Sequence, residues 1–150
     1  MRKFQFVGVL LLLMTISHSC INDDCTTQEV PPGRLAFNLC NKSTLQNIFV
    51  SGEYTTDELR ITNMNTGANV AYSTTTLEGN TYVIISGVGA TNETIRLQFE
   101  LRNQPVLEYS VTAERVTVEC YRVTDYKNHS FGSVAYEIEP NGAFKVLLDL

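Results

Sequence analysis

The chain has 150 residues, no tryptophan, 43% hydrophobic residues and a formal net charge of −5 at pH 7. Without Arg2 and Lys3, which belong to a segment predicted to be removed, nine basic residues remain against 16 acidic ones, a net charge of about −7. An acidic chain without a basic cluster argues against nucleic-acid binding and against adsorption to anionic lipid by charge. The length predicts a single folded domain.

Residues 1–19 have the three parts of a secretory signal peptide. Arg2 and Lys3 give a positive start, and the run from Phe4 to Ile16 is almost wholly apolar. This run has 13 residues, whereas a membrane-spanning helix needs about 20. Small or polar residues, Ser17-His18-Ser19, then lead to Cys20. The segment is therefore predicted to be a cleaved leader and not a transmembrane anchor.

Cys20 lies where cleavage of the leader is expected. Its thiol is a candidate for alkylation by a diacylglycerol, so that the mature chain would begin with a lipidated Cys20 held on a membrane by its acyl chains. Asp23 and Asp24 follow in a short polar stretch. The alternative is an ordinary signal peptide cleaved near Ser19, with Cys20 as a structural cysteine.

The chain has four cysteines: Cys20, Cys25, Cys40 and Cys120. If Cys20 carries lipid, three remain, and an oxidising compartment is expected to pair two of them. We expect the pair Cys40–Cys120, because both lie in strand-like segments, with Cys25 as the alternative partner. If Cys20 is not lipidated, two disulfides become possible. No CxxC spacing occurs and the mature chain has one histidine, His129, so neither a metal site nor a cofactor is predicted.

Residues 20–33 are predicted to form a polar tether ending in Pro31-Pro32-Gly33, and residues 34–150 the folded domain. In the domain, runs of β-branched and aromatic residues and alternation of apolar with polar residues predict short strands. They are expected at residues 34–40, 47–50, 59–62, 70–73, 81–86, 94–102, 106–112, 115–124, 134–139 and 143–148. The last two flank Asn141-Gly142, a dipeptide favoured by type I′ hairpin turns.

Many short strands, each with one polar face and with turns between them, predict an all-β fold. We expect an antiparallel β-sandwich, immunoglobulin-like or related, with a partly closed β-barrel as the alternative. Beyond the leader, the only helical signal is the Thr-x-x-Glu spacing of Thr55 and Glu58, which fits the capping box of a single turn.

The order of these features resembles that of small outer-membrane lipoproteins of the Bacteroidota. The features are the leader with Cys20 and its acidic pair, Phe37-Asn38-Leu39, the segment from Tyr54 to Ile61, Cys120 and Asn141-Gly142. The resemblance implies an exported β-rich lipoprotein with no established activity. It also implies that Asp23 and Asp24 form a surface-export signal, which favours the cell surface over the periplasmic face of the outer membrane.

Catalytic residues are sparse. Asp125, His129 and Ser130 lie in one short segment, whereas the members of a catalytic triad usually come from separate elements, so a solvated loop is the favoured interpretation. Glu137 and Glu139 share one strand face, as acids do on an outward face, and are not interpreted as the acid pair of a glycosidase.

The expected function is therefore a non-catalytic binding or accessory module of the cell envelope, attached to the membrane by lipid, with a protein or a glycan as its partner. A glycan would stack on exposed aromatic side chains, and the candidates are Tyr54, Tyr72, Tyr121 and Tyr126. One alternative is a small secreted hydrolase using Asp125, His129 or the strand carboxylates. The other is a subunit of a surface polymer built by strand donation.

Overall fold

The computed structural model describes residues 26–150. The predicted leader, the lipidation residue Cys20 and the acidic pair Asp23 and Asp24 lie outside this range.

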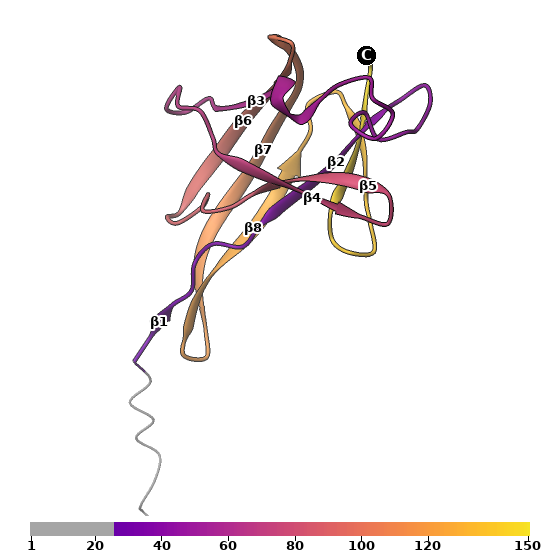
Figure 1. Cartoon of the computed structure of the whole chain (residues 1–150). Helices are drawn as coiled ribbons and strands as arrows, with labels where there is room; N and C mark the ends of the chain where they lie inside the picture. Colours follow the sequence, from indigo (N-terminus) through magenta and orange to yellow (C-terminus); the bar gives the residue numbers. More distant parts are fainter. Residues whose placement is uncertain (1–25) are drawn as a thin grey trace, which may run out of the picture.

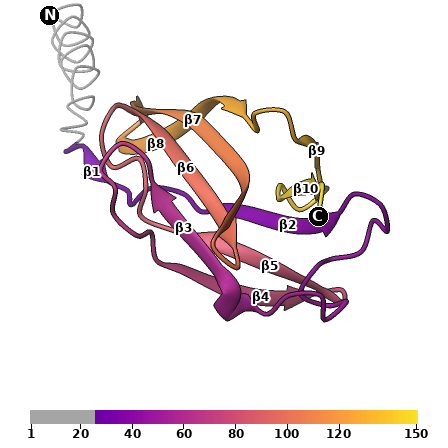
Figure 2. The ribbon, with the colours of Figure 1, turned by 90° about the horizontal axis from the view of Figure 1, so that it is seen from above.

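The described residues form ten strands in two five-stranded sheets, which pack face to face (Figures 1 and 2). In order across the sheet, sheet A consists of β1 (Gln28–Glu29), β8 (Tyr121–Ser130), β7 (Gln104–Val118), β6 (Glu93–Leu101) and β3 (Leu59–Asn63). Sheet B consists of β4 (Tyr72–Leu77), β5 (Asn80–Ile85), β2 (Leu35–Asn41), β10 (Phe144–Leu148) and β9 (Ala135–Ile138). The predicted all-β sandwich is confirmed, and the predicted single turn is a 3₁₀ turn, Thr56–Glu58.

Both sheets are mixed, which differs from the purely antiparallel sandwich expected. Strand β1 runs parallel to β8, and β10 runs parallel to β2. The second pair places the first long strand and the last strand of the chain side by side within sheet B. Alternation along one strand predicts which face is buried but carries no information on the direction of the neighbouring strand.

The core lies between the two sheets and is built from the alternating residues that the sequence pattern predicts. Leu35, Phe37 and Leu39 of β2 are buried and face the apolar side of sheet A. The Phe37 ring makes edge contacts with the rings of Phe99 and Tyr109, with centroids 5.1 Å away in both cases. Burial of these side chains is the main favourable contribution to folding.

The sandwich is bridged along one side and open along the other. On the bridged side, Thr62 of β3 pairs with Asn69, which lies shortly before β4. On the other side, β1 covers only the first two residues of β8, and sheet B ends at β9. We call this side the open seam: the second half of β8 (residues 125–130), the connecting segment (residues 131–134) and β9.

Two expectations about the middle of sheet A are wrong. Residues 115–124 do not form one strand, because the chain turns at Glu119 and Cys120, where Glu119 has φ of 54°. Residues 125–130 are the second half of β8, and not a solvated loop. The turn contains no Gly, Pro or Asn, so the strand-like pattern continues through it without a break.

The hairpin between β9 and β10 has the predicted position but not the predicted turn type. Gly142 N–H donates to the Glu139 carbonyl, 2.8 Å away, so Pro140 and Asn141 are the central residues. Gly142 has φ of 83°, whereas a type I′ turn would need positive φ at both central residues. Proline fixes φ near −65°, which selects a type I geometry followed by a left-handed glycine.

The predicted disulfide Cys40–Cys120 is wrong. Cys40, near the end of β2, is a buried free thiol, whereas Cys120, in the turn between β7 and β8, is disulfide-bonded. The end of β2 and the turn between β7 and β8 lie at opposite ends of the molecule (Figure 1). The other cysteines of the chain, Cys20 and Cys25, lie outside the described residues.

Candidate functional site

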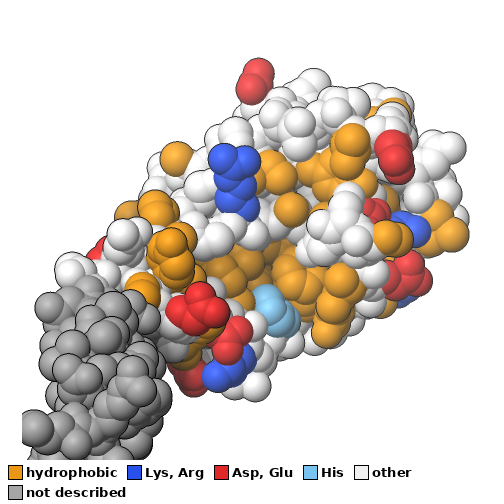
Figure 3. Space-filling model, turned by 90° about the horizontal axis from the view of Figure 1, so that it is seen from below, with side chains coloured by type: hydrophobic (Ala, Val, Ile, Leu, Met, Phe, Trp, Pro, Cys, Tyr) orange, Lys and Arg blue, Asp and Glu red, His pale blue; other side chains and the backbone are white. Residues whose placement is uncertain are grey.

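The open seam exposes apolar side chains that lie on the core-facing side of sheet B. Tyr136 and Ile138 of β9 pair with Val146 and Phe144, both of which are buried in the core. Nevertheless, Tyr136 is 42% exposed and Ile138 is 66% exposed, because sheet A does not extend over β9. Figure 3 shows apolar side chains on this face around His129, which is the histidine among the described residues.

A β-bulge in β8 brings His129 into this seam. Thr112 pairs with Lys127 and Ser110 pairs with Ser130, so β8 carries one extra residue between these pairs. Asn128, within the bulge, has φ of 56°. A bulge changes which residues face the interior, and His129 thereby points inward although the regular alternation would turn it outward.

His129 is held as a neutral ring among aromatic side chains. Its Nδ1 lies 2.8 Å from the Tyr109 hydroxyl, and its ring centroid is 4.9 Å from that of Phe144. Burial raises the pKa of Tyr109, so the hydroxyl keeps its proton and shares a hydrogen bond with Nδ1 whose direction is set by the tautomer of His129. Burial lowers the pKa of His129 and outweighs a hydrogen bond to the Tyr126 backbone, which acts in the opposite direction. The ring therefore packs as part of the cluster near neutral pH.

The structure does not bring together the residues of the hydrolase hypothesis. The Asp125 carboxylate lies 3.3 Å from Lys127 Nζ, within a surface ion pair. Ser130 lines a small hollow that also contains Arg96 and Ser110. His129 points to the core side, away from that hollow. All three residues belong to β8, but Asp125 and Ser130 point to the outer face of sheet A and His129 points to the core.

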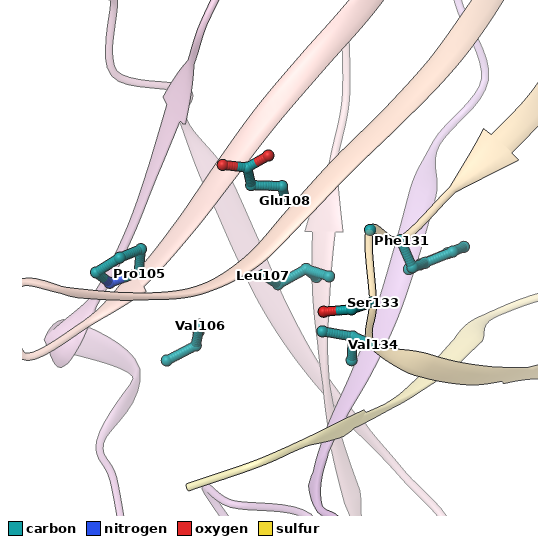
Figure 4. A pocket seen from close by; sticks show the side chains of 8 residues that line it. Pro105, Val106, Leu107, Glu108, Phe131, Ser133 and Val134 are labelled. Carbon is teal, nitrogen blue, oxygen red and sulfur yellow. The ribbon is translucent and has the colours of Figure 1, made fainter.

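A pocket of about 250 Å³ lies at one end of the seam, where β8 leaves sheet A (Figure 4). The last β8 pair is Ser110 with Ser130, so residues 105–108 of β7 lie beyond it. In Figure 4, Leu107 faces Ser133 and Val134 of the connecting segment. The pocket is smaller than the roughly 300–1,000 Å³ of typical small-molecule sites, so its size suits a single side chain of a larger partner.

The four tyrosines expected to stack on a glycan do not form a common surface. Tyr54 lies against the Arg102 guanidinium, 4.6 Å from its ring centroid. The Tyr72 hydroxyl donates to two carbonyls, and the Tyr126 hydroxyl donates to the Val88 carbonyl at 2.6 Å. Tyr121 is exposed but lies beside the turn between β7 and β8.

A polar cluster lies on the outer face of sheet B. Glu137 is exposed, as expected, but Glu139 is partly buried and accepts two hydrogen bonds. The donors are Asn38 Nδ2, 2.7 Å from Oε1, and the Tyr82 hydroxyl, 2.8 Å from Oε2. Burial, and after it the bond to Glu139, raises the pKa of Tyr82. These residues are far apart in the sequence, which is why no local pattern could predict the cluster.

Part of the predicted tether is attached to the domain. The Arg115 side chain is 5% exposed and its guanidinium donates to the Glu29 carboxylate at 2.7 Å and to the Val30 carbonyl at 2.9 Å. The same guanidinium donates to Thr124 Oγ1 at 2.7 Å. These bonds hold the segment from Gln28 to Val30 against β8, close to the turn that contains Cys120.

Within residues 26–150, no three His, Cys, Asp or Glu residues gather as metal ligands. None of the helical segments in this range has the length and apolarity that a membrane crossing requires. Comparisons of the chain with protein families, known proteins and solved structures find no match.

Proposed function

We propose that this chain is a non-catalytic, lipid-anchored protein of the bacterial outer membrane, exposed at the cell surface, that binds a protein partner along the open seam. The observation that carries the proposal is the exposure of Tyr136 and Ile138 on the core-facing side of β9. Exposed apolar groups beside a polar surface are typical of protein interaction sites.

The partner is proposed to be an extended protein segment that adds a strand beside β9. Strand β9 ends sheet B, so its outer edge is available for pairing. The alternating side chains of an added strand would cover Tyr136 and Ile138, and one side chain at the end of the seam would enter the pocket between β7 and the connecting segment.

A protein partner fits these features better than a glycan does. Sugars bind to exposed aromatic faces, but the candidate tyrosines are dispersed and three of them contact protein groups. A surface polymer would use the same edge with a second copy of the chain as the added strand, and it is one outcome of the experiment below.

The lipid anchor at Cys20 is supported by the cysteine count. Cys40 is a free thiol and Cys120 is disulfide-bonded. Cys25 is the alternative partner expected for a disulfide, and its pairing with Cys120 would leave Cys20, at the expected cleavage position, for the lipid. The acidic pair that follows Cys20 supports export to the surface through the resemblance stated above.

Photo-crosslinking in cells tests the seam. A photoreactive amino acid in place of Ile138 should give a discrete adduct, whereas the same amino acid in place of Val50, exposed in the loop that follows β2, should not. An adduct of twice the monomer mass would identify the polymer. Equal yields at both positions, or no adduct at either, would contradict the proposed site.

Radiolabelled palmitate tests the anchor separately. The label should be incorporated by the unmodified chain and by Cys25→Ala, and lost in Cys20→Ala. Incorporation that persists in Cys20→Ala would remove the anchor while leaving the seam proposal standing.

A further inference from the structure

We propose that Lys145 and Asn38 form an intramolecular amide bond, with Glu139 transferring the protons, so that β10 becomes covalently joined to β2. This would be a self-modification of the chain, and it goes beyond the binding function proposed above. An amine, a buried amide and a carboxylate lie close together on the outer face of sheet B.

The two reacting side chains are direct neighbours. Lys145 of β10 pairs with Asn38 of β2 in the parallel register, and neighbouring strands lie about 4.8 Å apart. Phe37 and Val146, one residue away on either strand, are buried in the core, so Asn38 and Lys145 both point to the outer face. The four-carbon stem of lysine is long enough to bring Nζ to the carbonyl carbon of a side chain at that separation.

The Asn38 amide is arranged as an electrophile. Asn38 is 2% exposed, and its Oδ1 accepts hydrogen bonds from Asn47 Nδ2 at 2.8 Å and from Cys40 Sγ at 3.3 Å. Two donors aimed at this oxygen would stabilise the negative charge that it gains when a nucleophile adds to the carbon. Burial keeps water away from the same carbon, which disfavours hydrolysis.

Glu139 lies at the nitrogen that has to leave. Its Oε1 is 2.7 Å from Asn38 Nδ2, and its Oε2 is fixed by the Tyr82 hydroxyl at 2.8 Å. A carboxylate within hydrogen-bond distance of the leaving nitrogen is placed for general acid–base catalysis. Lys145, Glu139 and Tyr82 line the same hollow on this face of sheet B.

The reaction balances without a further reactant. The Lys145 ammonium gives a proton to the Glu139 carboxylate, and the neutral Nζ attacks Asn38 Cγ. The new C–N bond forms, Glu139 protonates Nδ2, and the Cγ–Nδ2 bond breaks. The transfer to Nδ2 restores the Glu139 carboxylate, and the nitrogen leaves as ammonia, which takes up the remaining Nζ proton to become ammonium. Nothing is oxidised or reduced.

The same side chains would also be explained by structural pairing alone. Lys145 is 27% exposed and its Nζ lies 3.9 Å from Glu137, a loose ion pair. The two explanations differ in covalent mass. A crosslinked chain lacks one ammonia molecule, about 17 Da, and trypsin cannot cleave after a Lys145 whose amine is in an amide bond.

The experiment is mass spectrometry of the purified full chain and of its tryptic peptides. We expect the mass deficit of one ammonia and a branched peptide that joins residues 35–42 to a peptide containing an uncleaved Lys145. Lys145→Arg and Glu139→Gln should restore the full mass, whereas the matched control Glu137→Gln should keep the deficit. Circular dichroism checks that each variant is folded. If Glu139→Gln does not fold, Lys145→Arg alone decides whether the crosslink forms.

Three results would overturn the proposal. One is a full, unmodified mass of the unsubstituted chain, with normal tryptic cleavage after Lys145. Another is a deficit that persists in Lys145→Arg, which would place the lost ammonia in a cyclic imide of Asn38. The third is a crosslink that forms fully in folded Glu139→Gln, which would exclude Glu139 as the proton carrier. None of these results bears on the seam, so the proposed function is tested independently.

Discussion

Acidification provides a test of the aromatic cluster, because His129 is the histidine that remains after the predicted leader is removed. Burial lowers the pKa of His129 in the folded protein. Above the ordinary histidine pKa of about 6.5, the ring is neutral in both the folded and the unfolded chain, so it makes no pH-dependent contribution. As the pH falls below that value, the unfolded chain binds the proton more readily. We therefore expect the free energy of unfolding to decrease as the pH falls from about 6.5 through the lowered pKa of the folded state.

The magnitude follows from the number of protons involved. One proton bound only by the unfolded state lowers the free energy of unfolding by at most about 1.4 kcal/mol per pH unit. The actual slope should be smaller, because the partly exposed ring retains some solvation. Ordinary carboxylates titrate near pH 4, so the interval from about pH 5 to pH 7 isolates His129.

The assay is urea unfolding at several pH values in this interval, with His129→Gln as the comparison. Glutamine lacks a titrating ring but keeps a polar side chain that can accept from the Tyr109 hydroxyl. We expect a slope in the unsubstituted protein and a flat profile in the variant. Equal slopes in the two proteins, or greater stability of the unsubstituted protein at lower pH, would refute the placement of a neutral His129 in the cluster.

Three further predictions concern the core, the thiols and the tether. Phe37→Ala should lower the free energy of unfolding by about 3–5 kcal/mol in urea titrations, because a fully buried ring leaves a cavity between the sheets; a loss below about 1 kcal/mol would contradict the packing. Cys40 should react with a thiol reagent only after unfolding, whereas Cys120 should stay unreactive in unfolded chain until a reductant is added; alkylation followed by peptide mapping measures both. Arg115→Ala should release the N-terminal segment and speed its limited proteolysis about tenfold, equivalent to roughly 1.4 kcal/mol, whereas the exposed Arg122→Ala should leave the cleavage rate nearly unchanged.

Alternation in the sequence was sufficient to predict strands with one buried and one exposed face. Strand β6 is the clearest case: Ile95, Leu97 and Phe99 are buried, and the residues between them face outward. The buried face of such a strand can be predicted from its own residues, because one face contacts the core and the other contacts solvent. The hairpin that joins β9 to β10 was likewise predicted, through Asn141-Gly142.

The features that the sequence did not predict depend on contacts between distant segments. The disulfide assignment failed because a strand-like context does not say at which end of a sheet a cysteine lies: Cys40 is near the end of β2, and Cys120 is in the turn between β7 and β8 at the opposite end of the molecule. The bulge at Asn128 changes which residues of β8 face inward, so the position of His129 in the core could not follow from alternation even if residues 125–130 had been predicted as a strand. The open seam could not be predicted for a similar reason. The pattern places Tyr136 on an inward face but does not show that sheet A stops short of β9.

The two proposed sites share β9 and β10, and this sharing has a physical consequence. The core-facing side of β9 presents Tyr136 and Ile138 at the seam, while Glu139, which follows β9, is fixed on the outer face by Asn38 and Tyr82. A four-residue edge strand paired on one side is stabilised by few contacts, so the bonds of Glu139 restrict its movement before a partner arrives. Preorganisation of this kind lowers the entropy cost of binding. Glu139→Ala should therefore speed hydrogen exchange in β9 and weaken crosslinking from position 138, even though Glu139 itself lies on the opposite face of the sheet.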